Sequence, residues 1–287
     1  MSAREPCPPH GPSGAATVRV SVVVPCHNSS AFVEQTLRSI AAQTLSEIET
    51  VVVDDGSSDD TAAVVLRTIA AYPHCRMRLL RQPNAGTAAA RNRGIGQAQG
   101  RYILPLDADD LIAPTMLEEC SALLDADPGL ALVYPDREDF GDVEGARVAG
   151  RYELRRLKYF NQLPYCSLFR RVVWQDIGGY RVNVSGFDDW DFWVAAAARG
   201  FRGRHLPKPF LKHRRHGDSA MWRILGDYER LHARIMLNNR EVYSDAEVAM
   251  AERFLAGGEA SAMLRSARFV FLARYYDGYP RGQAPTR

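Results

Sequence analysis

Residues 18–28 read VRVSVVVPCHN, a β-branched run that ends in polar residues. A short run of this kind predicts a strand that is buried in a parallel sheet. We expect this strand over residues 20–24, where Pro25 stops it. The polar segment 28–30 then predicts the cap of a helix, whose apolar residues begin at Phe32.

The same alternation continues through the first 110 residues. Further strands are expected over 48–53, 77–81 and 102–106, with helices over 61–72 and 87–97. Strands that alternate with helices predict a doubly wound α/β sheet. Because the crossovers are right-handed, the carboxyl ends of the strands meet along one edge, where ligands of such sheets bind.

Polar residues gather at this edge of the predicted sheet, which makes it the candidate site. They are Asn28, Asp54, Asp55, Asn84 and Asp107. No Gly-x-Gly-x-x-Gly segment follows the first strand, so a dinucleotide-binding fold is not expected.

The second half of the chain is less regular. The expected helices lie at 115–126, at 189–199 and before Gly178-Gly179, and the expected strands at 130–134, 166–170, 202–206 and 209–215, with a hairpin through Gly141 and Gly145. From about residue 221 the pattern is helical. The Pro-rich start, residues 1–17, predicts a disordered leader because it lacks the apolar middle of a signal peptide.

Composition narrows the function classes. The 287 residues carry a net charge of +2, which gives no reason to expect a nucleic-acid partner. The five cysteines are scattered without zinc-ligand or disulfide spacing, which favours a reduced compartment. No apolar run is long enough to cross a bilayer. We therefore expect a cytoplasmic protein, with the inner face of the cell membrane as a further location.

One short stretch is strongly basic, and two interpretations stay open for it. It contains Arg202, Arg204, Lys208, Lys212, Arg214 and Arg215. Such a run is either a solvated face or a surface beside an anionic ligand.

Asp107-Ala108-Asp109 follows a buried strand directly. In extended backbone, residues i and i+2 point to the same side, so two carboxylates would repel unless a cation lay between them. Mg²⁺ or Mn²⁺, bound by carboxylates and diphosphate oxygens, meets that need. The alternative is that Asp109 and Asp110 cap the next helix.

Two more segments at this edge can hold a donor. Of Asp54 and Asp55, one could accept a hydrogen bond from a base and the other orient the loop, although both also suit a turn. Asn84 to Thr87 opens a helix whose free N–H groups favour an anion. Arg91 on that helix could face a diphosphate, although a surface position is the commoner outcome for a single arginine.

Residues 186–193 read GFDDWDFW, which mixes carboxylates with aromatic rings. The rings at 187, 190, 192 and 193 could form a wall for a sugar, or could simply belong to the core beneath a capped helix. A carboxylate beside apolar rings is well suited to act as a general base.

Five motifs in this order resemble those of glycosyltransferase family 2, which has the GT-A fold. They are VVVPCHN at 22–28, VVDDGSSD at 52–59, NAGTAAARN at 84–92, LDADD at 106–110 and GFDDWD at 186–191. The resemblance extends from residue 18 to about 216. It implies an α/β, Rossmann-like, doubly wound mixed sheet of the GT-A type, with a helical C-terminal extension.

The resemblance also implies a division of the chain and of its residues. Residues 18–110 would bind the nucleotide-sugar, 111–219 would form the acceptor-binding and catalytic half, and 220–287 would form the extension. The implied donor-binding residues are Pro25, His27, Asn28, Asp54, Asp55, Asn84, Gly86, Arg91, Asp107, Ala108, Asp109 and Trp190. The implied metal ligands for Mn²⁺ or Mg²⁺ are Asp107, Asp109 and His216, with His213 as a competitor for the last place.

The later acidic pair of the family is usually Glu-Asp, and here it is Asp188-Asp189. The resemblance implies that Asp188 and Asp189 are the catalytic residues, and because the second member is the base of the family, it implies Asp189 as the base. We expect Asp188 to cap the helix beside it. Asp191 lies about 200° further round a helix of ~3.6 residues per turn, so it cannot face the donor together with Asp189.

The implied reaction is transfer of a sugar, with inversion, from a nucleotide diphosphate donor to an acceptor hydroxyl. A UDP-sugar is favoured, while GDP- and dTDP-sugars stay open, as does an acceptor that is a lipid-linked glycan, a polysaccharide end, a peptide or a small metabolite. Two other functions are considered: a nucleotidyltransferase that makes a nucleotide-sugar, and a non-catalytic nucleotide-sugar-binding partner.

The C-terminal segment 260–287 mixes apolar residues with arginines. Such a helix could rest on an anionic membrane. We favour packing against the catalytic half or against a second subunit in a homodimer, because apolar helix faces usually serve a core.

Overall fold

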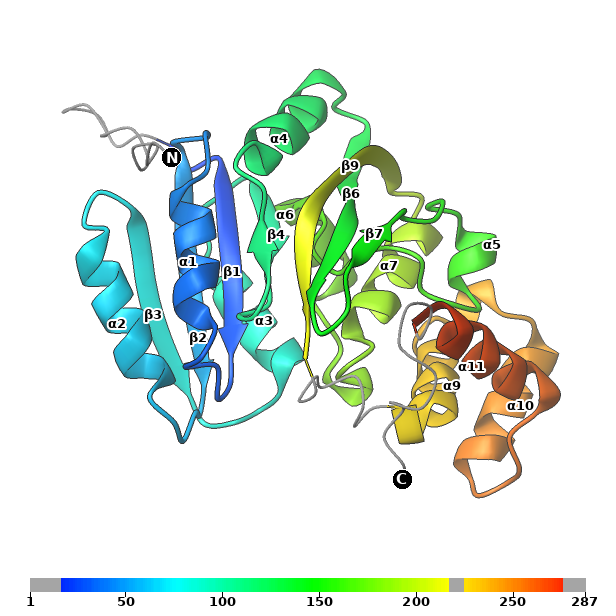
Figure 1. Cartoon of the computed structure of the whole chain (residues 1–287). Helices are drawn as coiled ribbons and strands as arrows, with labels where there is room; N and C mark the ends of the chain where they lie inside the picture. Colours follow the sequence, from blue (N-terminus) through cyan, green and yellow to red (C-terminus); the bar gives the residue numbers. More distant parts are fainter. Residues whose placement is uncertain (1–16, 217–224, 276–287) are drawn as a thin grey trace.

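A computed structural model describes residues 17–216 and 225–275 of the chain. Its centre is one mixed sheet (Figure 1). The described strands lie in the order β3 (Arg76–Gln82), β2 (Ile48–Asp55), β1 (Val20–Cys26), β4 (Tyr102–Pro105), β8 (Leu168–Arg170), β6 (Leu130–Gly141), β9 (Arg202–Arg215) and β5 (Leu111–Ile112), and β7 (Gly145–Arg147) pairs with β6. The first four strands of the chain are parallel, and β8 is antiparallel to both of its neighbours. This confirms the predicted doubly wound mixed sheet.

The strand β1 continues through Pro25 to Cys26, so the expected stop at Pro25 is wrong. The carbonyl of Val23 accepts a hydrogen bond from Leu106 N, which shows that Val23 faces β4. Pro25, two residues on, faces the same way, but β4 pairs with β1 only as far as Val23. The missing N–H of proline therefore falls where the sheet needs no donor.

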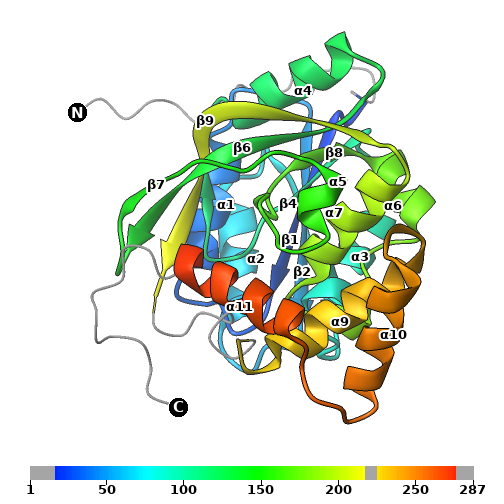
Figure 2. The ribbon, with the colours of Figure 1, turned by 90° about the vertical axis from the view of Figure 1, so that its right-hand side faces the viewer.

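Helices cover both faces of the sheet (Figures 1 and 2). One face carries α1 (Val33–Ala41), α2 (Thr61–Ala71) and α4 (Met116–Ala126), and the other carries α3 (Thr87–Gly96), α6 (Arg171–Ile177) and α7 (Asp188–Ala198). Alternate valines of β1 pack on opposite faces of the sheet. Val22 and Val24 pack beneath α1, α2 and α4, and Val23 packs beneath α3, α6 and α7. Burial of each valine contributes about 1.5–3 kcal/mol.

The predicted cap of α1 is wrong. Its N-cap residue is Phe32, which has no side-chain cap, and the backbone carbonyl of Ser29 accepts from the first amides instead. Asn28 turns away from the helix, has a left-handed φ of 51°, and accepts a hydrogen bond from Ser58 N at 2.8 Å. The polar segment 28–30 therefore joins two loops of the sheet edge, because its side chains find partners there.

The second half differs most from expectation. The two strands expected over 202–215 are one strand, β9, which pairs with β6 through two irregular places near Pro135 and Asp136. Residues 111–112 form β5 against β9 rather than the start of a helix. Two short helical turns, α5 (Leu154–Leu157) and η1 (Val182–Val184), were not predicted. The helix before Gly178 ends as predicted, with Gly178 in the left-handed region at φ 86°.

The C-terminal extension is helical. After the turn η2 (Leu225–Asp227), it contains α9 (Tyr228–Asn238), the turn η3 (Arg240–Val242), α10 (Asp245–Leu255) and α11 (Ala262–Tyr275). Figure 1 shows these helices grouped below α7 and apart from the parallel strands β1, β2 and β3. Tyr228 and Ile235 of α9 join the buried cluster beneath α7. Across the residues that the structure describes, no helix is both long and apolar enough for a membrane span. The predicted leader 1–17 lies almost wholly outside the described residues.

Candidate active site

The candidate active site lies at the carboxyl ends of β1, β2 and β4, next to the N-terminal ends of α3 and α7. Side chains from these elements contact one another there, through the hydrogen bonds described below. The sequence predicted this gathering, and the structure brings the motifs of residues 27–28, 54–55, 84–86, 107–109 and 188–189 to one region.

Asp55 orients the loop that precedes α3. Its carboxylate accepts hydrogen bonds from the backbone N–H groups of Ala85 and Gly86, both at 2.8 Å, and from the Gln82 amide at 2.7 Å. Gly86 has φ 87°, a left-handed conformation that favours glycine. A Cβ there would also lie 3.2 Å from Ser185 Oγ, beside the start of α7. Of the two roles expected for the acidic pair, Asp55 thus has the loop-orienting one.

Asp54 is fully buried. Its two carboxylate oxygens accept from Ser57 N at 3.0 Å and from Arg81 Nε at 3.1 Å. These contacts fit the turn chemistry that was the alternative interpretation, because both oxygens have protein partners. Gly56, in the loop that follows the acidic pair, lies close to Asn84, since a Cβ on Gly56 would approach Asn84 N to 2.7 Å.

His27 links the loops at the end of the sheet. Its Nδ1 lies 2.9 Å from the carbonyl oxygen of Asp55 and 3.1 Å from Asn84 Nδ2. Because His27 is exposed while Asp54 and Asp55 are buried, its ring and Asn84 form the outer surface of this corner. A planar base that entered here would meet these side chains first.

Arg91 is buried, with 4% of its surface exposed, and it bridges two carboxylates. Its Nη1 donates to Asp188 Oδ2 at 2.6 Å, and its Nη2 donates to Asp107 Oδ1 at 2.7 Å. Burial opposes the charge, but the carboxylates of Asp107 and Asp188 raise the pKa of Arg91 well above its usual value. The guanidinium of Arg91 joins the Asp-x-Asp segment to α7, and the contact expected between Arg91 and a diphosphate stays a prediction.

The segment Asp107 to Asp110 is a turn and not extended backbone, since Asp110 N donates to the carbonyl of Asp107. The argument that Asp107 and Asp109 share a side therefore does not apply. Asp107 forms an ion pair with Arg91, while Asp109 Oδ2 lies 3.0 Å from His216 Nε2. His216 thus joins the site as predicted.

The competitor His213 belongs to a different cluster. Its Nδ1 lies 3.2 Å from the buried carboxylate of Asp139. Burial lowers the pKa of His213, and the hydrogen bond to Asp139 opposes that effect. Of the two candidate histidines, His216 therefore contacts Asp109 and His213 contacts Asp139.

Asp110 holds the Asp-x-Asp turn in place and does not cap a helix. Its carboxylate accepts from Arg214 N at 2.7 Å and from the hydroxyl of Tyr165, which in turn accepts from Asp107 N at 3.1 Å. The helix α4 begins only at Met116. The role of Tyr165 was not predicted, because a single tyrosine in an irregular segment gives no sequence signal.

The start of α7 presents Asp189 to the site. Asp188 does not cap the helix as expected: the N-cap is Phe187, and Asp188 instead accepts from Arg91 and from Gly186 N. Asp189 is half-buried and accepts a hydrogen bond from Asn161 Nδ2 at 2.8 Å. Burial, assisted by the charge of Asp188, raises the pKa of Asp189 to about 7. A carboxyl group with this pKa can accept a proton near neutral pH.

The aromatic rings of α7 belong to the core and do not form a wall for a sugar. Phe187, Trp190, Phe192 and Trp193 have at most 3% of their surface exposed. The Trp190 indole donates to the carbonyl of Leu157, and its ring packs among rings of α9. The assignment of Trp190 to donor binding is therefore corrected.

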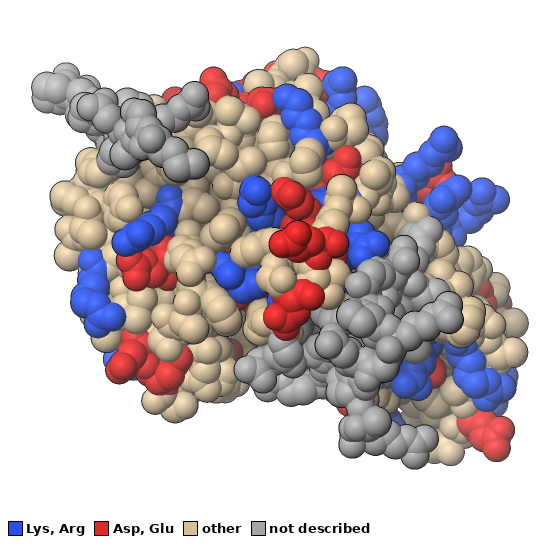
Figure 3. Space-filling view, viewed as in Figure 1, with Lys and Arg blue, Asp and Glu red and all other residues tan. Residues whose placement is uncertain are grey.

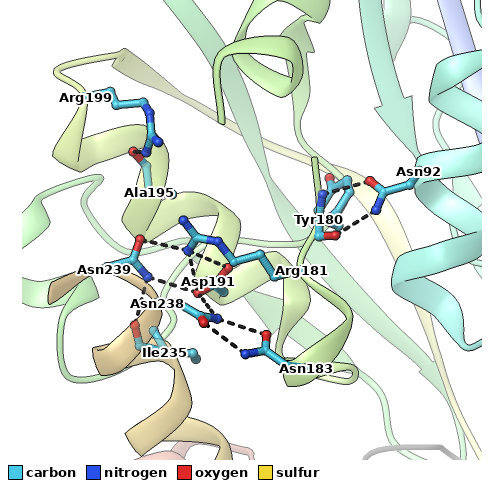
Figure 4. A network of polar contacts seen from close by, with 10 residues as sticks. All are labelled: Asn92, Tyr180, Arg181, Asn183, Asp191, Ala195, Arg199, Ile235, Asn238 and Asn239. Carbon is cyan, nitrogen blue, oxygen red and sulfur yellow. Dashed lines mark hydrogen bonds and ion pairs between the residues drawn. The ribbon is translucent and has the colours of Figure 1, made fainter. Parts of the chain in front are cut away.

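Asp191 joins α7 to α9 (Figure 4). Its buried carboxylate accepts from Arg181 Nη1 at 3.1 Å to each oxygen, from Asn238 at 3.1 Å and from Asn239 at 3.0 Å. These contacts occupy both carboxylate oxygens of Asp191, and the expectation that Asp191 does not face the donor stays a prediction. Its role is to fix the helix that carries Asp189.

The basic stretch on β9 is largely neutralised. Figure 3 shows acidic side chains gathered over β6 and β9 with basic side chains beside them. The ion pairs are Arg202–Asp127, Lys208–Glu119 and Lys212–Glu138. These contacts favour the solvated-face interpretation for this part of the stretch. Arg214 differs, because its Nε donates to the carbonyl of Asp109 within the site.

Comparison with known proteins identifies the family of the chain. The model of the family described as glycosyl transferase family 2 matches residues 21–184. The chain is 28% identical over 218 residues to the hyaluronan synthase of Pasteurella multocida, a match that covers 74% of this chain and 22% of that protein. It is 27% identical over 222 residues to the chondroitin synthase of Escherichia coli, which covers 76% of this chain and 32% of the relative. The chain thus spans about a fifth to a third of the length of these relatives.

Solved structures share the fold. The crystal structure of S. aureus TarS 1-349 superposes with a TM-score of 0.63 at 22% identity, over 90% of this chain and 74% of that one. The mannosyltransferase PcManGT from Pyrobaculum calidifontis, in complex with GDP-Man and Mn²⁺, superposes with a TM-score of 0.62 at 22% identity, over 91% and 76% of the two chains. The fold is therefore the GT-A fold of these glycosyltransferases.

Proposed function

The chain belongs to glycosyl transferase family 2, and on that premise we propose that it transfers a sugar from a nucleoside diphosphate donor to an acceptor hydroxyl, with inversion. The observation that carries the proposal is the place of Asp189. It lies at the start of α7, and its neighbour Asp188 is tied through Arg91 to the Asp-x-Asp turn. The base and the donor loops therefore belong to one connected site, with residues 18–110 for the donor and 111–219 for the acceptor.

The proposed reaction is one displacement at the anomeric carbon. The acceptor oxygen forms the new bond to that carbon while the bond to the diphosphate oxygen breaks. Asp189 takes the proton of the acceptor hydroxyl, and the diphosphate leaves with the electron pair. Because attack and departure occur on opposite sides of the carbon, the configuration inverts.

A UDP-sugar is the donor that we favour. Support comes from structures with the same fold, since TarS 1-349 was solved in complexes with UDP and with UDP-GlcNAc. PcManGT was solved with GDP-Man instead, so a GDP-sugar is the alternative arm of the test. In this chain the base would lie at the corner formed by His27, Asn84 and the loop after Asp54.

A divalent ion fits the site in part. Among residues 17–216 and 225–275, no group of three or more His, Cys, Asp or Glu side chains is arranged to hold an ion. Asp109 and His216, which lie 3.0 Å apart, would be the protein ligands, and Asp107 is held by Arg91. Mg²⁺ and Mn²⁺ are commonly bound by one or two carboxylates together with substrate phosphates. When bound, such an ion stabilises the charge of the departing diphosphate.

The test is turnover of a panel of nucleotide-sugars with Mn²⁺, with and without excess chelator. Asp189→Asn keeps the shape and removes the basicity, so we expect turnover to fall about 10²–10⁴-fold with little change in donor affinity. Asp245→Asn is the matched control, because Asp245 also lies in the first turn of a helix but is exposed on α10. We expect turnover to stop in chelator and to return with Mn²⁺ or Mg²⁺.

Four outcomes would contradict parts of the proposal. Release of pyrophosphate rather than nucleoside diphosphate would favour a nucleotidyltransferase. Donor binding without turnover would favour a non-catalytic binder. Near-normal turnover of Asp189→Asn would show that Asp189 is not the base. Full activity in excess chelator would show that the reaction does not need a divalent ion.

A further inference from the structure

Asn161 lies in the irregular segment between α5 and β8, and the start of this segment is anchored to the helices around it. The carbonyl of Leu157 accepts from the indole of Trp190, and the carbonyl of Lys158 accepts from the hydroxyl of Tyr243 at 2.9 Å. His232 Nε2 lies 2.9 Å from the same Lys158 oxygen. The backbone that leads to Asn161 is therefore held by α7, by α9 and by the segment before α10.

The side-chain amide of Asn161 has a defined orientation. Its Oδ1 accepts from the backbone N–H of Leu163 at 3.1 Å, and its Nδ2 donates to Asp189 Oδ2 at 2.8 Å. If the amide were flipped, its oxygen would face a carboxylate oxygen and its NH₂ group would face an N–H group. Both contacts would be repulsive, so the hydrogen-bond network settles the assignment of oxygen and nitrogen.

From this geometry we infer that Asn161 is a positioning residue for the general base. It holds the carboxylate of Asp189 in one orientation and stabilises the ionised form that accepts the acceptor proton. The inference rests on the proposed function, and it extends that function to a residue outside the five motifs. Asn161 acts through Asp189 and does not itself react.

The neighbours of Asp189 explain why such a donor is needed. Asp188 is the adjacent acid, and its negative charge disfavours a second carboxylate beside it. The positive charge of Arg91 is engaged by Asp188 and Asp107 through its two terminal nitrogens. Asn161, in the segment between α5 and β8, therefore gives Asp189 a hydrogen-bond donor without introducing another charge.

A purely structural tether between Asn161 and α7 would show the same hydrogen bond, so the test needs a readout of ionisation. A donor to a carboxylate favours the charged form and lowers the pKa of Asp189. Without it, the pKa of Asp189 rises, and the acidic limb of the pH–rate profile moves to higher pH. From the usual strength of a hydrogen bond to a charged group, we expect a shift of roughly one pH unit.

The experiment compares Asn161→Ala, Asn161→Asp and the control Asn183→Ala in the full chain. Asn161→Asp has the same shape but no amide donor, and it places a second acid against Asp189. We expect turnover at neutral pH to fall roughly 5-fold or more in both variants, because a one-unit rise from a pKa of about 7 lowers the ionised fraction of Asp189 by about that factor. The donor KM should not change, and the pH shift should be larger for Asn161→Asp. Asn183 has an exposed side chain that pairs with Asn238, so its truncation should leave the profile unchanged.

A double-mutant cycle separates positioning from general damage. If Asn161 acts through Asp189, then Asn161→Ala should change turnover less than about 2-fold when Asp189→Asn is already present, because interacting residues are not additive. Full multiplication of the two effects would overturn the inference, as would an unmoved acidic limb in both single variants. Thermal unfolding of each variant identifies any that fail to fold, and Asn161→Asp remains available if Asn161→Ala is one of them.

The outcomes distinguish this inference from the proposed function. If Asp189→Asn abolishes turnover and both Asn161 variants keep normal turnover and a normal pH profile, only the role of Asn161 is wrong. If Asp189→Asn keeps normal turnover, the base assignment is wrong, and the role of Asn161 is overturned with it.

Discussion

The carboxylate of Asp189 is subject to opposing influences. Burial and Asp188 favour its neutral form, while Arg91, the Trp190 backbone and Asn161 favour its charged form. The first group dominates and raises the pKa of Asp189 to about 7. A general base works only when it is deprotonated. A raised pKa therefore means that the enzyme becomes inactive at a higher pH as the solution is acidified.

This predicts the pH dependence of turnover. The rate should be constant above about pH 8 and should fall as pH decreases through about 7, to roughly one tenth of the plateau at pH 6, because about a tenth of the carboxylate is then ionised. The check is a profile of kcat/KM for the donor and acceptor, measured at constant ionic strength. A limb near pH 4, typical of an unperturbed aspartate, would show that burial does not control this group.

Arg91 carries a second prediction. Its removal would leave Asp188, which is 2% exposed, without its main partner. Breaking a buried pair by removing one member typically costs about 3–5 kcal/mol, so Arg91→Met should lower the free energy of unfolding by about that amount. Arg93→Met is the control on the same helix, because Arg93 is exposed, and its effect should stay within about 0.5 kcal/mol. Urea unfolding measures both, and equal effects would show that the bridge adds nothing to stability.

Sequence predicted which residues converge better than it predicted what each one contacts. The ends of parallel strands meet by topology, so Asp55, Asn84 and Asp107 could be placed together without coordinates. The partners of Arg91 lie 16 and 97 residues away along the chain. Such a pairing depends on how α3 and α7 pack on the sheet, which no local pattern contains. The role of Asn161 was missed for the same reason, since it lies 28 residues from Asp189.

At the scale of elements, the N-terminal turn of α7 belongs to the candidate site, and most of the rest of the helix is buried in the core. Its first turn holds Asp188 and Asp189, and its later residues, from Phe192 to Ala196, are fully buried. Asp191 stands between these parts and fixes the helix to α9. The helix can therefore present Asp189 at a constant position, because both its apolar side and its buried acid are held.

Replacement of Asp191 by Asn should separate stability from chemistry. The substitution keeps the shape but leaves Arg181 without its anionic partner, so the free energy of unfolding should fall by about 1.5–3 kcal/mol, the usual worth of hydrogen bonds to a charged group. Turnover at a temperature where the variant is folded should fall far less than for Asp189→Asn. A larger loss of turnover from Asp191→Asn would mean that the helix is rotated from the phase described here.

The elements that sequence missed are those without a local period. β5 has two residues and exists only because β9 lies beside it. β9 looked like two strands because Pro207 and Pro209 interrupt its pattern, but it remains continuous against β6 through irregular pairing. The long parallel strands and amphipathic helices of the first half were predicted well, because the apolar pattern of each segment indicates which of its faces are buried.

At the scale of the molecule, the site depends on contacts between the two halves of the sheet. The parallel half supplies Arg91 and Asp107, and the half that includes β8, β6 and β9 supplies Tyr165, Asp188 and His216. The C-terminal helices support the second half from outside through α9. A change in those helices should therefore act on the site through stability and not through direct contact.

This bears on the choice between a packed and a membrane-bound α11. Leu264 is fully buried in the cluster of the extension's own helices, and Ala267, 7% exposed, joins the cluster that contains α7. One side of α11 is therefore packed, in part against the catalytic half as we expected. Phe269 is 73% exposed and lies on the same helix as the exposed Arg265, which is the pattern that an anionic membrane would attract. The two sides allow a matched pair of truncations, Leu264→Ala and Phe269→Ala.

We expect Leu264→Ala to lower the free energy of unfolding by about 2–5 kcal/mol, because it opens a cavity in a buried cluster. Phe269→Ala should change that free energy by less than about 0.5 kcal/mol, since the ring is mostly in solvent. Removal of residues 260–287 should destabilise the chain in the same direction as Leu264→Ala. In flotation with vesicles that contain anionic lipid, the intact chain should stay with the soluble fraction. Strong, salt-sensitive flotation that is lost in Phe269→Ala and in the truncated chain would instead assign the exposed side of α11 to the membrane surface.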